Sequence, residues 1–230
     1  MKYTSTRSSF SCDSLQAVLS GIAPDGGLFI SPEILSSPFD WKSVIGLPTL
    51  KMAERILGHL LPEFKDMGSL VARAYEGKFE TPDLTPLVKV GNMYVLELFR
   101  GPTSAFKDVA LSMLPQLITA AKKQTGAKDQ TIILTATSGD TGKAALEGFH
   151  DVPGTGIIVF YPDGGVSPIQ RAQMVTLALP CTGRLWVMVR MLAPAPEITV
   201  STWLRIPVSC DRSMEITALR PSEMCTGSRM

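Results

Sequence analysis

The chain has 230 residues, of which 45% are hydrophobic and 19% are charged, and its formal net charge is +1. This length accommodates one large domain or two small ones with a buried core, and the composition is too apolar for a disordered protein. Because 22 lysines and arginines stand against 21 aspartates and glutamates, the charge balance predicts neither a nucleic-acid partner nor binding to an anionic membrane.

Residues 1–80 combine a turn-rich opening with a helical pattern, so we expect a small, mainly helical N-terminal region. The first seven residues are polar and no apolar run follows them, which argues against a secretory signal. The sequence Ala-Pro-Asp-Gly-Gly at 23–27 predicts a tight turn. Apolar residues at helical spacing predict a helix over 49–61 that ends at Pro62.

Residues 81–176 alternate strand and helix patterns. Apolar runs predict strands over 93–98, 131–136 and 156–161, and the β-branched run at 131–136 is typical of a buried parallel strand. A helix is expected after each strand, the second from near Thr141 and the third from Ser167-Pro168. The first helix is expected to carry one apolar side formed by Phe106, Ala110, Met113, Leu114, Leu117 and Ala121. This order predicts an α/β fold with a parallel sheet flanked by helices.

Residues 177–230 break the pattern. Every lysine of the chain lies at or before Lys143, whereas arginines continue to the end, and three of the four cysteines fall in this stretch. It shows no clear helical face, strand alternation or turn sequence. Two interpretations remain open, a disordered or atypical extension and a sequence translated past a frameshift, and the second is preferred.

Neither a membrane span nor a metal site is predicted. The most apolar stretch, 185–208, contains charged residues and prolines and is not a bilayer-spanning segment. The cysteines lie far apart without a C-x-x-C motif, so neither a zinc site nor a disulfide framework is expected. We therefore expect a cytoplasmic protein with reduced thiols.

Lys107 is the first candidate for chemistry. A Gly-Pro turn at 101–102 precedes Thr103 and Ser104, either of which is expected to cap the next helix. Lys107 then falls in or near the first helical turn, where a cation opposes the helix dipole. Partial desolvation beside Phe106 would favour the neutral amine that a Schiff-base lysine needs. The alternative, a solvated surface lysine, is the more common case.

The second candidate is the loop Ser138-Gly139-Asp140-Thr141-Gly142, between a strand and a helix. Its glycines let the backbone approach a ligand, and the N-terminus of the helix offers N–H groups for a carboxylate or phosphate. Ser138 and Thr141 add hydroxyl donors. The spacing matches neither a Walker A loop nor G-x-G-x-x-G. An ordinary turn capped by Asp140 or Thr141 is an equal alternative.

A second strand-to-helix loop at 161–170 is expected at the same end of the sheet, where parallel sheets bind ligands. Its Gly164-Gly165 pair and Ser167-Pro168 cap would also make an ordinary connection. The two histidines, His59 and His150, are isolated, and no Ser-His-Asp or paired-carboxylate arrangement can be assembled.

Six segments together resemble the threonine synthase family, pyridoxal-phosphate enzymes of the tryptophan-synthase-β-like group, fold type II. They follow the family's order and spacing over about residues 1–176. They are 3–7 (YTSTR), 23–29 (APDGGLF), 97–99 (ELF) with 101–103 (GPT), 105–108 (AFKD), 136–142 (ATSGDTG) and 164–167 (GGVS). The loop resembles the synthase more than the dehydratases and cysteine synthases of this group, which usually carry Asn there.

The resemblance implies a cofactor, a reaction and roles for both candidates. Lys107 would hold pyridoxal 5′-phosphate as a Schiff base and later move protons. Ser138, Gly139, Asp140, Thr141 and Gly142 would lie beside the cofactor and the substrate carboxylate. The reaction would be that of a lyase in threonine biosynthesis, which converts O-phospho-L-homoserine and water into L-threonine and phosphate.

The sequence departs from the family at two points, and these departures leave other functions open. Arg100 stands where the family usually has His before Gly-Pro-Thr, and the resemblance ends after Thr176, before the segment that binds the cofactor phosphate. We therefore expect a truncated chain that binds pyridoxal phosphate weakly or not at all. A non-catalytic fragment or interaction protein exposing an apolar sheet edge is the main alternative. A nucleotide-binding α/β module using the 138–142 loop ranks last.

Overall fold

The computed structural model describes residues 1–137, 139–162, 165–177, 186–191 and 214–218. The chain divides into two compact units, Met1–Asp129 and Gln130–Met230. The first unit contains the whole predicted N-terminal region together with Lys107. The domain boundaries expected at residues 80 and 176 stay predictions.

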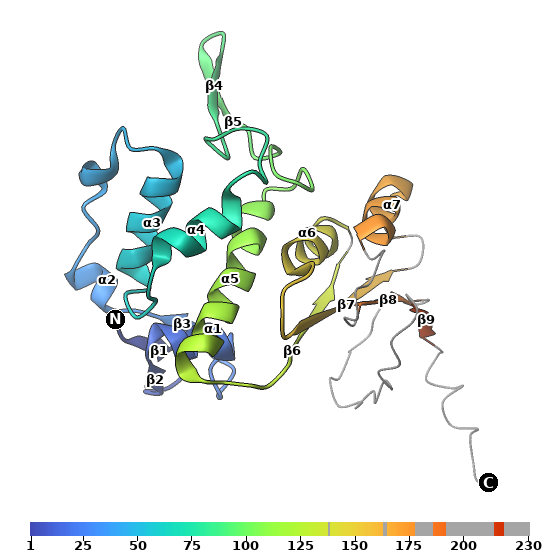
Figure 1. Cartoon of the computed structure of the whole chain (residues 1–230), viewed down its shortest axis with the longest axis horizontal. Coiled ribbons are helices and arrows are strands. Elements are labelled where there is room, and N and C mark those ends of the chain that lie inside the picture. The colour runs from blue at the N-terminus through green and yellow to red at the C-terminus, as the bar shows by residue number, and fades with distance from the viewer. Residues whose placement is uncertain (138, 163–164, 178–185, 192–213, 219–230) are drawn as a thin grey trace. The chain divides into compact units, whose positions relative to one another are not determined.

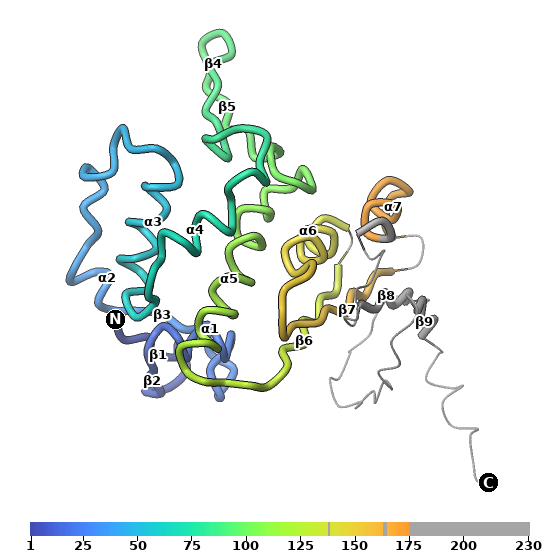
Figure 2. Tube along the Cα trace, in the orientation of Figure 1, coloured from blue at the N-terminus to red at the C-terminus, as the bar shows by residue number. Residues whose placement is uncertain are grey.

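A small antiparallel sheet with strand order β2-β1-β3 opens the first unit. Its strands are β1 (Tyr3–Ser5), β2 (Ser11–Cys12) and β3 (Phe29–Ile30). Figure 2 shows that the chain returns to place β3 beside β1. The predicted turn at 23–27 is confirmed, because Ala23 N–H donates to the Gly27 carbonyl at 2.9 Å and Gly26 has φ +76°. Such short strands carry too little alternation to be predicted.

The rest of the first unit is mainly helical. Its helical segments are α1 (Ser14–Ser20), α2 (Glu33–Ser36), the 3₁₀ helix η1 (Trp41–Val44), α3 (Thr49–Leu60), α4 (Met67–Tyr75) and α5 (Asp108–Thr125). The helix predicted over 49–61 is confirmed as α3. The Asp13 and Asp66 side chains accept N–H groups of the first turns of α1 and α4, which stabilises those helix ends.

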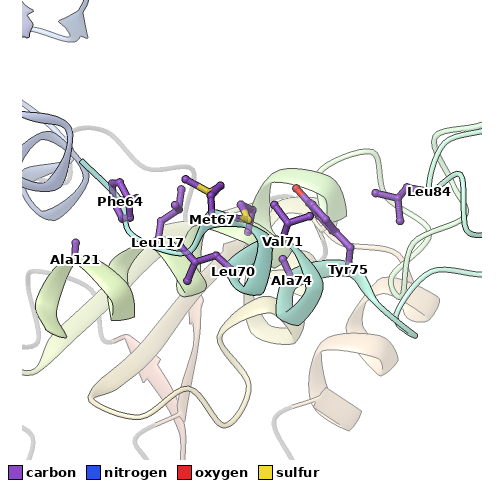
Figure 3. Packing of buried hydrophobic residues seen from close by; sticks show 10 residues of the cluster. Phe64, Met67, Leu70, Val71, Ala74, Tyr75, Leu84, Leu117 and Ala121 are labelled. Atoms are coloured by element: carbon purple, nitrogen blue, oxygen red, sulfur yellow. The ribbon is translucent and has the colours of Figure 1, made fainter. Parts of the chain in front are cut away.

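The core of the first unit lies between α4 and α5 (Figure 3). The Tyr75 hydroxyl donates to the Val109 carbonyl at 2.9 Å, and burial raises the pKa of Tyr75 to about 12. Phe106 and Ala110, expected on the buried side of α5, are exposed instead. The buried members of the cluster are Phe64, Met67, Leu70, Val71, Ala74, Tyr75, Leu84, Met113, Leu117 and Ala121.

The strand predicted at 93–98 is present but belongs to a different sheet. It forms β5 (Met93–Leu96), which pairs antiparallel with β4 (Leu87–Val90) in a two-stranded hairpin. Only Gly91-Asn92 separates the strands, and Gly91 has φ +62°, as a tight hairpin turn requires. Its partner is the strand that immediately precedes it, so β5 belongs to this hairpin and not to the parallel sheet.

The second unit confirms the predicted α/β fold with a parallel sheet. All four strands run parallel in the order β6-β7-β8-β9. The elements are β6 (Thr131–Ala136), α6 (Asp140–Phe149), β7 (Thr155–Pro162), α7 (Pro168–Leu177), β8 (Trp186–Met191) and β9 (Met214–Ala218). Strand β7 is buried, whereas β6 ends the strand order and exposes alternate residues, including Ile132 and Leu134. The remaining residues of β6 are only half-buried, so the prediction of a buried strand is wrong for β6, although its parallel pairing is confirmed.

Strands β8 and β9 come from the stretch in which the sequence showed no pattern. Strand β8 pairs with β7 and β9 pairs with β8, so 177–230 contributes to the sheet. Cys181, Cys210 and Cys225 lie outside the described residues, and the frameshift interpretation stays a prediction. Among the helices that the structure describes, none has the length and apolar character needed to cross a membrane.

Candidate functional site

A buried carboxylate organises the turn before α5. Asp108, 1% exposed, accepts hydrogen bonds from the Thr103 N–H at 2.8 Å, the Thr103 hydroxyl at 2.5 Å and the Ala105 N–H at 3.4 Å. A Cβ at Gly101 would lie 2.4 Å from Asp108 Oδ2, so only glycine fits there. Ser104 adopts φ +56°, a costly conformation for a residue with a side chain. The Asp108 carboxylate thus binds residues 101–105 to the start of α5.

Lys107 is the residue at which this turn becomes helix. Its carbonyl accepts the Leu111 N–H at 2.9 Å, and it is the N-cap of α5. The predicted caps, Thr103 and Ser104, are wrong, because Asp108 holds Thr103 in the preceding turn. The Lys107 side chain is partly buried, and its Nζ lies 5.3 Å from the centroid of the Phe106 ring. The amine is therefore presented on a turn whose backbone is fixed by a buried side chain.

Arg100, the residue that departs from the family pattern, forms two ion pairs and a backbone hydrogen bond. Its guanidinium donates to Glu80 at 2.8 Å and to Glu97 at 2.8 Å, and its carbonyl accepts the Glu80 N–H at 3.0 Å. Hydrogen bonds to these two carboxylates raise the pKa of Arg100. Its Cζ also lies 5.0 Å from the Phe99 ring centroid. Arg100 thus ties the chain ahead of Gly101 to residue 80.

In the second unit, Thr137 shapes the loop between β6 and α6. Its Oγ1 accepts the N–H groups of Gly139 at 3.0 Å and Gly142 at 3.2 Å. Two donors that were expected to face an anion are therefore bonded to Thr137. The cap of α6 is Gly139, with φ +146°, and not Asp140 or Thr141. Ser138 lies outside the described residues.

The loop is tightly packed at its second glycine. A Cβ at Gly142 would lie 2.4 Å from Thr137 Cγ2 and 2.9 Å from Val159 Cγ1. Glycine is thus needed for α6 to approach β6 and β7. Thr141 follows Asp140 in the first turn of α6, and its side chain is partly buried.

Asp140 joins this loop to the next one. Its Oδ1 accepts a hydrogen bond from Gln170 Nε2 at 3.1 Å and faces Lys143 Nζ at 3.2 Å. Ser167 and Gln170 hydrogen bond reciprocally, which confirms Ser167 as the cap of α7. The loops that the sequence placed at one end of the sheet are therefore in contact through side chains. Residues 163–164 lie outside the described part of the chain.

The two most N-terminal family segments contact one another. The Ser5 hydroxyl donates to Asp25 at 2.8 Å, and the Thr6 hydroxyl accepts the Leu28 N–H at 3.0 Å. Hydrogen bonds from Ser8, the Gly27 N–H and Ser5 lower the pKa of Asp25. These residues stabilise the contact of β1 with the turn before β3.

The histidines and acidic residues form no further centre in the described residues. The ring of His59 packs against Phe39 with centroids 5.3 Å apart, and His150 Nδ1 lies 3.5 Å from Asp151. Nowhere in the described ranges do three or more metal-ligating side chains gather closely enough to hold a metal ion.

Asp108, Thr137 and Gln170 lie within the segments singled out from the sequence, but no role was predicted for any of them. Only Gln170 had a usable signal, the Ser-x-x-Gln spacing of a capping box. Lys107 lies in the first unit and residues 139–142 lie in the second.

Solved structures share this architecture. The threonine synthase from Brucella melitensis, solved with PLP bound, matches with a TM-score of 0.69 and 34% identity, over 82% of this chain and 41% of that one. The threonine synthase from yeast matches with a TM-score of 0.71 and 32% identity, over 84% of this chain and 40% of that one. The fold is therefore that of the fold type II pyridoxal-phosphate enzymes.

Sequence relatives narrow this class to one family. The family model described as threonine synthase N terminus matches residues 2–88. The threonine synthase of Schizosaccharomyces pombe is 38% identical over 195 residues, which are 78% of this chain and 37% of that protein. This chain belongs to the threonine synthase family. It spans well under half the length of the curated relatives it matches.

Proposed function

We propose that this chain carries the cofactor lysine and one ligand loop of a threonine synthase, a lyase that forms L-threonine and phosphate from O-phospho-L-homoserine and water. The turn at residues 101–108 is the observation that carries the proposal. A charged residue buried to 1% exposure and a glycine that accepts no side chain both serve to hold this turn. The residue that the turn presents is the lysine of the family motif.

The residues present fit pyridoxal 5′-phosphate. Its aldehyde requires a primary amine on a fixed backbone, and Lys107 supplies one that is partly buried beside an aromatic face. When bound, the cofactor supplies an electron sink for negative charge that develops on the substrate carbons. The Brucella melitensis threonine synthase, whose structure was solved with PLP bound, supports this choice of cofactor.

The chain's own residues would bind, orient and move protons. Lys107 would hold the cofactor through its Nζ and, once released, carry protons to and from the substrate. Ser138, Gly139, Asp140, Thr141 and Gly142 would lie beside the cofactor and the substrate carboxylate, with Thr141 donating through its hydroxyl. Asp140 is already held by Gln170 and Lys143, so it is suited to orienting the loop.

We further propose that the partner is a small molecule, without nucleic acid or membrane, and that the protein works in the cytoplasm. The near balance of 22 basic and 21 acidic residues supports the first statement. The scattered cysteines, without a disulfide pattern, support the second.

Borohydride trapping tests the function directly. The chain is incubated with pyridoxal phosphate and reduced, so that even a weak lysine adduct becomes permanent, and the modified peptide is located by mass spectrometry. We expect the label on Lys107 and its protection by O-phospho-L-homoserine. A label spread over exposed lysines, or concentrated on another residue, would refute the assignment.

A second candidate, an interaction protein, is favoured by the β4–β5 hairpin. Every residue of both strands is exposed, although seven of the eight are apolar or aromatic. Figure 1 shows the hairpin extending away from α4 and α5. An isolated hairpin with two uncovered apolar faces suits contact with another chain.

The double change Val88→Lys with Val95→Glu separates the two candidates. These residues are directly opposite in the hairpin, so the new pair places opposite charges across the strands and in the middle of an apolar face that Val90 and Met93 share. If the hairpin drives association, the molar mass measured by light scattering falls at least about two-fold towards that of the single chain, because the contact of two copies is lost. An unchanged mass, or an unmodified chain that is already monomeric, contradicts this candidate.

A further inference from the structure

The side-chain amide of Gln170, in α7, makes two contacts. Its nitrogen contacts the 139–142 loop, and its oxygen contacts the residue that caps α7. Gln170 Nε2 donates to Asp140 Oδ1 at 3.1 Å, and Gln170 Oε1 accepts the Ser167 N–H at 3.1 Å. The backbone N–H of Gln170 donates to Ser167 Oγ at 3.2 Å. The two contacts of the amide fix the side chain in one orientation, between the loop after β7 and the loop after β6, and the backbone contact fixes the start of α7.

The same side chain packs on the backbone of Gly139. A Cβ at residue 139 would lie 2.5 Å from Gln170 Cδ and 2.5 Å from Gln170 Nε2. Gly139 also has φ +146°, a region that residues with side chains rarely adopt. The unusual backbone conformation at the start of α6 is therefore formed directly against the Gln170 amide.

Lys143 completes the restraint on Asp140. Its side chain is 8% exposed, and Nζ lies 3.2 Å from Asp140 Oδ1 and 3.3 Å from Gln173 Oε1. An ammonium in the first turn of a helix opposes the helix dipole and loses hydration when buried, so its contacts to Asp140 and Gln173 offset an unfavourable placement. The first residue of α6 is thus connected to α7 through Gln170 directly and through Lys143 and Gln173.

We propose that Gln170 is a positioning residue that sets the conformation of the 139–142 loop, by holding Asp140 and packing on Gly139, and thereby sets the affinity of this loop for its anionic ligand. The identity of that ligand, pyridoxal phosphate with its bound substrate, rests on the function proposed above. The conformational role of Gln170 rests only on the contacts in the second unit.

Two variants and a matched control test the role in the full chain without ligand. Gln170→Met keeps the length of the side chain and removes the amide, whereas Gln170→Glu keeps the acceptor for Ser167 and replaces the donor to Asp140 by a second carboxylate. Gln130→Met makes the same chemical change at an exposed position. Hydrogen exchange is measured at the Gly139 and Gly142 amides, both of which donate to Thr137 Oγ1.

We expect exchange at these two amides to be about 10-fold faster in Gln170→Met, a change that corresponds to about 1.4 kcal/mol of opening free energy. Amides in β7, such as that of Val159, should keep the unmodified rate, and Gln130→Met should change nothing. In Gln170→Glu the loop should be loosened at about pH 7 and protected again towards about pH 5, as protonation of the new carboxyl group restores a donor to Asp140. Gln170→Met should show no such recovery relative to the unmodified chain at the same pH.

Unchanged exchange at Gly139 and Gly142 in both variants would overturn the proposal. So would equal acceleration in β7, because a general loss of stability is not positioning. A second readout, the concentration of pyridoxal phosphate that half-saturates borohydride labelling of Lys107, should rise several-fold in Gln170→Met. If Lys107 is not labelled even in the unmodified chain, the proposed cofactor role fails, while the exchange measurement still decides the role of Gln170.

Discussion

Lys107→Arg is expected to abolish borohydride-trapped pyridoxal phosphate while leaving the first unit folded. A guanidinium keeps the positive charge and its position over the Phe106 ring, but it is not the primary amine that condenses with an aldehyde. Because the side chain is only partly buried, the free energy of unfolding should change by less than about 0.5 kcal/mol. Labelling is measured by intact mass and stability by hydrogen exchange of buried amides in α4 and α5.

Lys123→Arg is the matched control. It makes the same change on an exposed residue in the last turn of the same helix. Labelling of Lys107 in the Lys123→Arg protein should equal that in the unmodified chain. Undiminished labelling of the Lys107→Arg protein would show that another lysine binds the cofactor, and the proposed site would then be wrong.

Asp108→Ala is expected to destabilise the first unit by about 3 kcal/mol and to weaken labelling of Lys107 as well. The change removes a carboxylate acceptor and leaves the Thr103 N–H and hydroxyl buried without it. Hydrogen bonds to charged groups contribute about 1.5–3 kcal/mol each, and an unsatisfied buried donor costs about 1–3 kcal/mol. Hydrogen exchange in α4 and α5 reports this loss for the first unit alone.

Two comparisons make the Asp108 prediction specific. Asp13→Ala removes an exposed cap that accepts one N–H, from Gln16 at 2.8 Å, and should cost about 1 kcal/mol. Asp108→Asn keeps one acceptor oxygen but places an amide donor among donors. Its loss of unfolding free energy should therefore lie between those of Asp13→Ala and Asp108→Ala. A loss at Asp108→Ala no larger than that at Asp13→Ala would mean that the buried carboxylate does not organise the turn.

The elements that the sequence predicted well are those whose pattern is local. Strands β6 and β7 have continuous apolar and β-branched runs, and α3 has apolar residues at helical spacing, so each shows its type within a window of its own length. The Ser167-Pro168 cap and the 23–27 turn are equally local, because their hydrogen bonds join residues at most four apart.

The hairpin and the caps show where local pattern was insufficient. The run at 93–98 has the pattern of a strand, but its partner is decided by β4 and by the two-residue turn between them. Thr103 has a good capping side chain, yet its hydroxyl bonds to Asp108 and the helix begins later. In both cases a competing partner nearby changed the outcome that intrinsic preference favoured.

By itself, the sequence determined the α/β order of the second unit, the helical character of the first, and the segments that carry Lys107 and residues 138–142. Only the tertiary structure decided which distant side chain holds the 139–142 loop, because Gln170 contacts Asp140 from α7. Gln170 lies thirty residues from Asp140 along the chain. Such a contact depends on the parallel pairing of β6 with β7, which brings both strand ends to one edge, and periodicity within either segment does not encode it.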